Sequence, residues 1–234
     1  MNLRFGLFIF VYLSLGIIVN ALFLIFFPLA FLFDPQRRIY IRILYFHHYL
    51  VSSLFWETEV TGYPIRRCRP PCIFVMNHQT ILDSFTLFAM DPLICKLVMA
   101  SGFKLVPVIG TITIFVKMVF VNRASDNSKK TSLSQSVACL EKGVSLILAP
   151  EGRLSHSREL GPFKIGAFSA ADAAGVPVIP ARTESRLLLE EGSRMKLRRG
   201  TMRLHLFDPI ETRDRSPEEV RDLAFQAINS ISLE

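Results

Sequence analysis

The sequence predicts an α/β fold, a mixed sheet flanked by helices, with an N-terminal hydrophobic membrane-anchoring helical segment. Downstream of residue 62, short apolar runs alternate with helical stretches, which is the pattern expected of an α/β domain. Upstream, residues 5–33 carry no charged side chain, and roughly 20 apolar residues are enough to cross the hydrocarbon core of a bilayer as a helix.

Length and composition fit one domain with an appended apolar segment. The chain has 234 residues, and a single core can grow to roughly 250 residues before chains tend to divide. Hydrophobic residues make up 50% of the chain and the mean hydropathy is +0.36, so some apolar surface is expected to face lipid. We therefore expect a membrane-anchoring helical region at residues 1–55 and one larger domain at residues 56–234.

The apolar run is expected to be retained rather than cleaved as a signal peptide. A cleaved signal peptide has a basic start, a shorter apolar core and a small-residue cleavage site, whereas this run continues through residue 33 without such a site. Asn20 and Pro28 interrupt the run. One tilted or kinked spanning helix and two shorter helices that stay in one leaflet therefore both remain open.

Positive charge after the run predicts the orientation in the membrane. Arg37, Arg38 and Arg42 follow it, against Arg4 before it, and such an excess marks the cytoplasmic side. We therefore expect an inner (cytoplasmic) membrane protein whose larger domain faces the cytosol.

Residues 39–56 mix aromatic and aliphatic side chains with two adjacent histidines. This composition suits an amphipathic helix at the membrane surface, and a helix packed on the domain core is an equal alternative. His47 and His48 would point about 100° apart on a helix, so they are poorly placed to hold one ligand, and we expect them to be interfacial.

Net charge alone does not choose a partner. The formal charge of +7 and the pI near 9.5 imply attraction to polyanions, which include nucleic acid and anionic lipid. Lys and Arg are spread over many segments, with a dense cluster only at residues 194–203. This distribution disfavours nucleic acid, and we expect the cluster to face anionic lipid.

Cysteine usage points to neither disulfides nor a metal. The four cysteines are few and scattered, and no second Cys or His pair follows Cys68 and Cys72 at zinc spacing. We therefore expect reduced thiols and no metal site.

The predicted elements of the larger domain follow from hydrophobic pattern and end signals. Strands are predicted at residues 72–76, 93–99, 118–121, 144–149, 176–180 and 202–207. Helices are predicted at residues 132–143 and 166–175, each ending at a glycine, and from residue 217, after a serine cap.

Asn-His-Gln-Thr-Ile-Leu-Asp, residues 77–83, directly follows a predicted buried strand. A spacing of five would set His78 and Asp83 about 140° apart on one helix, so we place His78 on the turn before it. Thr80 is then a plausible helix cap, with Asp83 three residues on. From there Asp83 could accept a hydrogen bond from one imidazole nitrogen and leave the other as a general base. A capping aspartate beside a partly buried histidine is the alternative.

Two further charged segments follow predicted strands. Glu151, Gly152 and Arg153 follow one strand, with Lys164 close behind, and such a loop could hold a phosphate or a polar head group. Arg123 emerges from another apolar strand. Alone, each would also fit an ordinary surface loop.

These three segments, in this order, resemble the glycerolipid acyltransferase family. Its Asn-His-x4-Asp motif is matched by Asn77, His78 and Asp83, and its strand-end arginine by Arg123. Its Pro-Glu-Gly-Thr-Arg-Ser and Val-Pro-Ile-Pro motifs are matched at residues 150–155 and 176–180, and the resemblance covers about residues 55–210. Arg153 and Leu154 stand where Thr-Arg is usual, which leaves Arg153 and Arg158 as alternative contacts.

The resemblance implies a membrane acyltransferase that uses acyl-CoA or acyl carrier protein as its donor and needs no cofactor. His78 would take the proton from the hydroxyl of a lysophospholipid, 1-acyl-sn-glycerol-3-phosphate above all, and Asp83 would orient His78. Backbone amides near Gly152 could stabilise the oxyanion. The candidates for the phosphate end of the acceptor are Arg123, Glu151, Gly152, Arg153 and Lys164. A remodelling or lyso-aminolipid acyltransferase is the alternative.

Overall fold

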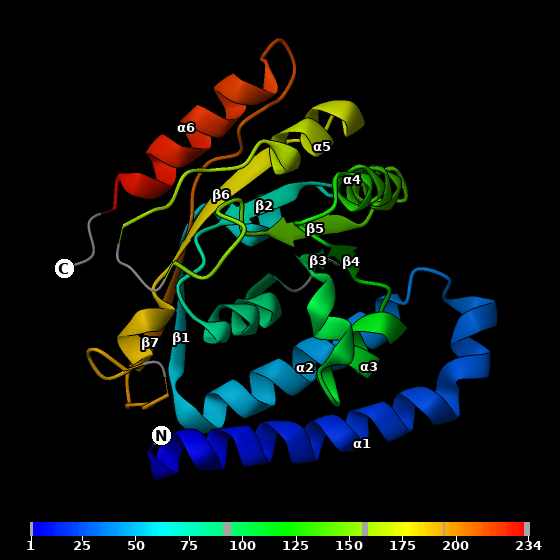
Figure 1. The fold of residues 1–234 in the computed structure, drawn as a ribbon, viewed down its shortest axis with the longest axis vertical. Coiled ribbons are helices and arrows are strands. Elements are labelled where there is room, and N and C mark those ends of the chain that lie inside the picture. Colours follow the sequence, from blue (N-terminus) through cyan, green and yellow to red (C-terminus); the bar gives the residue numbers. More distant parts are fainter. Residues whose placement is uncertain (1, 91–94, 156–158, 194, 232–234) are drawn as a thin grey trace.

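The protein folds into a seven-stranded sheet that lies between two layers of helices (Figure 1). The computed structural model describes residues 2–90, 95–155, 159–193 and 195–231, without the side chains of residues 27–31 and 87–90. The strands are β1 (Glu57–Gly62), β2 (Ile73–Met76), β3 (Cys95–Ala100), β4 (Val119–Val121), β5 (Ser145–Leu148), β6 (Val178–Thr183) and β7 (Thr201–Leu206). The α-helices are α1 (Leu3–Phe33), α2 (Arg38–Phe55), α3 (Ile109–Phe115), α4 (Asp126–Glu141), α5 (Gly166–Ala174) and α6 (Pro217–Asn229). Four 3-10 helices are η1 (Ile65–Arg67), η2 (Ile81–Met90), η3 (Ser101–Leu105) and η4 (Ser185–Leu188).

The strand order is β1-β7-β6-β2-β5-β3-β4, and it places the carboxyl ends of the parallel strands along the same side of the sheet. Strands β2 to β6 run parallel to their neighbours within the order β6-β2-β5-β3-β4, so their carboxyl ends share that side. β7 is antiparallel to β6 and parallel to β1, which makes the sheet mixed, as predicted. Loops at the carboxyl ends of parallel strands are where α/β proteins commonly place functional groups.

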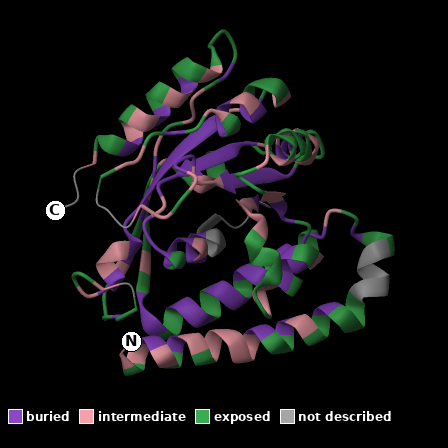
Figure 2. Cartoon of the chain, in the orientation of Figure 1, coloured by how far each residue is buried: buried purple, intermediate pink, exposed green. Residues whose placement is uncertain are grey.

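Side-chain alternation along the central strand divides the core into two halves. On β2, Phe74 and Met76 pack toward α1, α2 and α3, whereas Ile73 and Val75 pack toward α4, α5 and α6. A strand covered on both faces reads as a continuous apolar run, as β2 does. In Figure 2 the central strands are accordingly buried over most of their length.

The apolar N-terminal run forms one helix, α1, rather than two shorter ones. It packs antiparallel on α2, and the start of α1 meets the end of α2 where Arg4 Nη2 donates to the Phe55 carbonyl. Among the described residues, one helix is long and apolar enough to cross a membrane, Leu3–Phe26, and 28% of its apolar window is buried. The remainder of its surface carries exposed apolar side chains, which include Phe10, Ile17 and Ile25.

Helix α2 packs on the domain core, which is one of the two alternatives that its sequence left open. Its inner face packs on the sheet through Tyr40, Ile41 and Leu44. Its outer face exposes large side chains, among them Phe46 and Leu54, in line with the exposed surface of α1.

The prediction that His47 and His48 are interfacial is wrong, because α1 folds back over them. Both are buried, and the ring of Tyr12 lies 5.0 Å from His47 and 5.8 Å from His48. Burial lowers the pKa of His48 to about 3, so its imidazole is neutral at pH 7.

Helices α4, α5 and α6 begin or end at capping residues that can be recognised in the sequence. Ser216 and Glu219 form a reciprocal capping box at the start of α6. Gly175 ends α5 in the left-handed conformation, with φ of 62°. Ser125 caps α4, which begins at Asp126, six residues before the predicted start at residue 132. The prediction began late because the first turns of α4 are polar and show no apolar pattern.

Predicted strands match the observed ones to within three residues where they are described. Residues 93 and 94 of one predicted strand lie outside the described residues. β1 was not predicted, because it is a largely exposed edge strand of sequence Glu-Thr-Glu-Val-Thr-Gly, with a single large apolar side chain. It begins just after α2 ends, near the predicted boundary between residues 55 and 56.

Replacing Tyr45 by phenylalanine should destabilise the docking of α2 on β3. The buried hydroxyl of Tyr45 donates to the Cys95 carbonyl at 3.0 Å and accepts from the Cys95 N–H at 2.9 Å. Tyr45→Phe removes both bonds inside the core, so we expect a loss of about 1–3 kcal/mol of unfolding free energy in detergent. Tyr49→Phe on the exposed face of α2 is the control, and equal stability of the two variants would contradict this packing.

Candidate active site

The candidate site lies where the carboxyl ends of β2, β5 and β6 meet. β2 ends at Met76, and the next side chain, Asn77, is buried and joins the end of β6. Its amide Nδ2 donates to the Thr183 carbonyl at 2.9 Å, and its Oδ1 accepts from the Thr183 N–H at 2.7 Å. Because both ends of the amide are used, the turn that follows β2 is held in one orientation.

His78 and Asp83 form the hydrogen bond that their spacing predicts. His78 Nδ1 lies 2.8 Å from Asp83 Oδ2. The Asp83 side chain is 3% exposed and that of His78 is 32% exposed, so one partner is fixed inside the protein while the other reaches the surface. A carboxylate can only accept, so Nδ1 carries the proton and Nε2 is left with its lone pair. This is the arrangement of a general base with an orienting carboxylate.

Asp83 also closes the turn from which η2 begins. Its Oδ2 accepts from the backbone N–H groups of Gln79 at 2.8 Å and Thr80 at 3.0 Å. Thr80 Oγ1 accepts from the Leu82 N–H at 3.0 Å. The capping role predicted for Thr80 and Asp83 is therefore present, but the helix that follows is a 3-10 helix. The capping and the orienting roles, which the sequence presented as alternatives, are carried by the same carboxylate.

Glu151 joins the loop after β5 to the turn that carries His78. It is buried, with Oε1 accepting from the His78 N–H and Oε2 from the Gly161 N–H, both at 2.9 Å. The Ser155 N–H donates back to the His78 carbonyl at 2.8 Å. Because both carboxylate oxygens of Glu151 accept from backbone groups, the residue acts by organising the loop around His78.

Gly152 makes room for Lys164 within the same loop. Its φ of +72° favours glycine, and a Cβ built there would lie 2.8 Å from Lys164 Nζ. The Gly152 N–H donates to the Ala149 carbonyl at 3.1 Å, so this amide is engaged in the turn, and the expectation that backbone amides near Gly152 stabilise the oxyanion stays a prediction. Lys164 and Arg153 are both exposed beside it.

Arg123 lies at the same edge of the sheet but on its far side. It follows the end of β4 by two residues, is exposed, and is separated from β2 by β5 and β3 in the strand order. The structure therefore gathers His78, Asp83, Glu151 and the Gly152 loop, and leaves Arg123 at the margin. Arg158, the alternative basic contact, lies outside the described residues.

Sequence reasoning missed Ser185, which contributes to the site from the segment after β6. Its buried hydroxyl donates to Asp83 Oδ1. The only local signal is its place after the strand that matches the Val-Pro-Ile-Pro motif, and a serine there is unremarkable without the three-dimensional contact.

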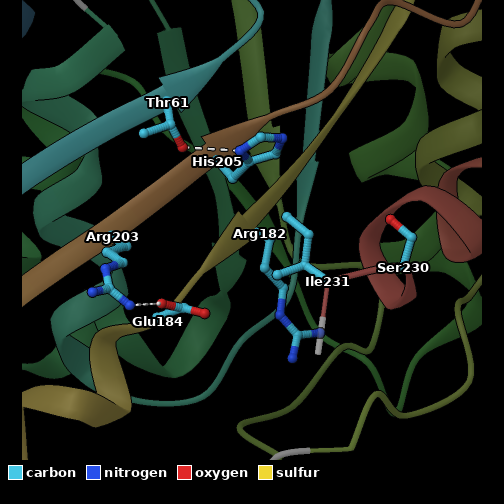
Figure 3. A pocket seen from close by; sticks show the side chains of 7 residues that line it. All are labelled: Thr61, Arg182, Glu184, Arg203, His205, Ser230 and Ile231. Carbon is cyan, nitrogen blue, oxygen red and sulfur yellow. Dashed lines mark hydrogen bonds and ion pairs between the residues drawn. The ribbon is translucent and has the colours of Figure 1, made fainter. Parts of the chain in front are cut away.

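A polar hollow lies on the face of the sheet near the end of α6, beside the candidate site (Figure 3). It has a volume of about 380 Å³ and is lined by Thr61, Arg182, Glu184, Arg203, His205, Ser230 and Ile231. Burial lowers the pKa of Arg182, while the charges of Glu184 and Glu151 act in the opposite direction. At the end of β6, Arg182 and Glu184 thus line the hollow, whereas the next residue, Ser185, bonds to Asp83.

Comparison with known proteins gives consistent matches. A family model described as Acyltransferase matches residues 57–184, more than half of the chain. The chain is 31% identical over 216 residues to 1-acyl-sn-glycerol-3-phosphate acyltransferase BAT2, chloroplastic, of Brassica napus, covering 88% of this chain and 61% of that protein. It is 28% identical to the 1-acyl-sn-glycerol-3-phosphate acyltransferase of Escherichia coli, covering 67% of each chain.

The fold is also found in a solved structure. The crystal structure of the 1-acyl-sn-glycerophosphate (LPA) acyltransferase, PlsC, from Thermotoga maritima matches with a TM-score of 0.67 and 18% identity, covering 94% of this chain and 97% of that one. The chain spans 61% of the Brassica napus relative and 52% of an Arabidopsis thaliana relative, LPAT1.

Glu151→Gln should destabilise the loop that surrounds His78. One of the two backbone N–H groups would then face the NH₂ end of the amide and lose its acceptor, which costs about 1–3 kcal/mol when the group is buried. Urea unfolding in detergent measures this loss, with Glu141→Gln at the exposed end of α4 as the matched control. Indistinguishable stabilities would contradict the bridging role of Glu151.

Proposed function

Because this chain belongs to the acyltransferase family whose model matches residues 57–184, we propose that it transfers an acyl group from a thioester to the free hydroxyl of 1-acyl-sn-glycerol-3-phosphate, giving phosphatidic acid. The hydrogen bond between His78 Nδ1 and Asp83 Oδ2 carries the proposal, because it leaves the partly exposed Nε2 as a proton acceptor. The relatives named 1-acyl-sn-glycerol-3-phosphate acyltransferases support the choice of acceptor.

The reaction proceeds by direct attack of the acceptor. His78 Nε2 takes the proton of the acceptor hydroxyl while its oxygen bonds to the thioester carbonyl carbon, forming a tetrahedral oxyanion. Collapse of that oxyanion breaks the C–S bond, and the imidazolium returns the proton to the departing thiolate. Asp83 stays ionised throughout and stabilises the charged imidazole, and a positioned base of this kind contributes roughly 10²–10⁴-fold to the rate.

Exposed basic groups on the neighbouring loops would hold the acceptor's phosphate. Arg153 and Lys164 extend from the segment that Glu151 fixes against His78, so their positions follow from the same hydrogen bonds as the base. Arginine offers a planar fork of donors to a phosphate, and lysine a mobile point charge. Arg123, at the margin of the site, would add long-range attraction rather than a first contact.

The acyl donor is acyl-CoA or an acyl carrier protein, both of which present the acyl group as a thioester. Neither the pair nor its loops distinguish them. The alternative is a lyso-aminolipid acceptor or a remodelling reaction, because Arg153-Leu154 stand where the family's Thr-Arg is usual. These alternatives share the chemistry at His78 and differ only in what the basic loop recognises.

Membrane attachment would bring the site to both lipid substrates. Both α1 and α2 expose large apolar side chains, which include Leu24, Phe46 and Leu54. The α/β domain then faces the cytosol.

The basic cluster at residues 194–203 would meet the same membrane, because it adjoins the start of α1. Asn2 Nδ2 donates to the Leu197 carbonyl at 2.9 Å. Arg198 and Arg199 are exposed beside it, while Arg194 lies outside the described residues.

His78→Ala should abolish transfer of labelled acyl groups to lysophosphatidic acid while the protein still folds and binds membrane. The substitution removes the proton acceptor but leaves Asp83 with its backbone donors. Purified protein in detergent, offered acyl-CoA or an acyl carrier protein thioester with a panel of lyso-lipids, provides the assay, with products identified by mass spectrometry. Turnover retained by His78→Ala would rule out its proposed role.

Binding to anionic vesicles should exceed binding to neutral ones. Each basic side chain near an anionic surface contributes about 1 kcal/mol, so Arg199→Gln should weaken binding to anionic vesicles roughly fivefold and leave neutral vesicles unaffected. Arg213→Gln, an exposed arginine before α6, is the control. Equal binding of the native chain to both vesicle types would contradict a lipid-facing cluster.

A further inference from the structure

Asp83 is held by a donor that lies outside its own motif. Its Oδ2 accepts from His78, Gln79 and Thr80, all within five residues of it. Its other oxygen, Oδ1, accepts from the hydroxyl of Ser185, which is 102 residues away in sequence and fully buried. Among the residues that the structure describes, Ser185 is thus the one from a distant segment that donates a hydrogen bond to this carboxylate.

The direction of this hydrogen-bond chain follows from the chemistry of its members. A carboxylate only accepts, so the Ser185 hydroxyl proton points at Asp83. The contact of 2.7 Å between Thr80 Oγ1 and Ser185 Oγ must then carry the proton of Thr80. Thr80 in turn accepts from the Leu82 N–H. The Leu82 N–H therefore donates to Thr80, Thr80 donates to Ser185, and Ser185 donates to Asp83 Oδ1. On the other oxygen, Asp83 Oδ2 accepts from His78.

We propose that Ser185 is a positioning residue, which fixes the rotation of the Asp83 carboxyl group and thereby the orientation of the His78 imidazole. This inference rests on the proposed function of His78 as the base. With Oδ1 bound to Ser185 and Oδ2 to the turn, the carboxyl plane cannot rotate without breaking hydrogen bonds in a buried site. Ser185 does not contact substrate, so it affects the rate of the chemical step and leaves acceptor affinity unchanged.

The backbone that leads to Ser185 is held independently of this hydroxyl. Thr183 is bonded to Asn77 through its backbone, and Glu184 turns to the opposite face, where it forms an ion pair with Arg203 at 3.6 Å (Figure 3). Removing the hydroxyl therefore removes a donor from Asp83 without releasing the segment. The effect expected on catalysis is separable from an effect on folding.

Several other ionisable groups pack near the pair and enter any pH profile. Glu151 bonds the His78 N–H, and Arg182 acts on Glu151 from β6. His48 approaches η2 through Phe85, with ring centroids 4.8 Å apart, and is neutral. None of these contacts involves the Ser185 hydroxyl, so a change confined to Ser185 reports on Asp83.

The test compares Ser185→Ala with a matched loss of a buried hydroxyl elsewhere. Ser136→Ala, in α4, removes a hydroxyl that bonds the Ser132 carbonyl at 2.8 Å, far along the chain from the site. We expect Ser185→Ala to lower kcat about tenfold with KM unchanged, as a lost hydrogen bond to a charged group implies. The acid-side midpoint of its kcat/KM profile should move to higher pH, because a carboxylate with fewer donors holds the imidazolium proton more strongly.

A second pair of variants covers the case in which Ser185→Ala does not fold. Thr80→Val, which is isosteric, removes the proton that Ser185 accepts and should shift the same midpoint in the same direction, but less. Thr80→Ser keeps that proton and should retain the native profile. Both are measured with whichever acceptor the native chain uses.

Three results would overturn the proposal. They are an unchanged kcat and acid-side midpoint in Ser185→Ala, equal changes in Ser136→Ala, or equal profiles for Thr80→Val and Thr80→Ser. Absence of turnover in the native chain would contradict the proposed function instead. Ser185 would then be judged by the imidazole ¹⁵N spectrum, in which Ser185→Ala must shift the His78 Nδ1 resonance and Ser136→Ala must not.

Discussion

The site depends on one constraint, that the ionised carboxylate of Asp83 must be satisfied inside the protein. An isolated buried carboxylate is strongly unfavourable, so its oxygens need donors on every side. Those donors are His78, Gln79 and Thr80, in the turn between β2 and η2, and Ser185 after β6. Meeting this requirement ties the turn after β2 to the segment after β6 and holds His78, whose side chain is 32% exposed, beside them.

The two N-terminal helices and the site belong to one packed unit. η2, which begins with the turn that Asp83 caps, inserts Phe85 among Phe8, Trp56 and His48 of the N-terminal region. Burial of these rings ties the position of η2 to the packing of α1 against α2. The position of His78 relative to α1 and α2 is therefore fixed by this packing.

Local sequence predicted what local contacts decide. The contact between His78 and Asp83, the serine cap at Ser216, and the buried strand before residue 77 all depend on neighbours within a few positions. The bond from Glu151 to the His78 N–H spans 73 residues and that from Ser185 to Asp83 spans 102, so neither has a local signature. His47 and His48 were misplaced for the same reason, because their burial depends on α1 folding back across them.

The tautomer of His78 is the most direct test of the site, because the first step of the proposed chemistry, removal of the hydroxyl proton, requires the proton on Nδ1 and the lone pair on Nε2. Imidazole ¹⁵N–¹H correlation spectra of the protein in detergent micelles at neutral pH, with His78 assigned through its loss in His78→Ala, distinguish the two forms. We expect a protonated Nδ1 and an unprotonated Nε2. A proton on Nε2 with Nδ1 bare would contradict the hydrogen bond to Asp83 and the role of His78 as the base.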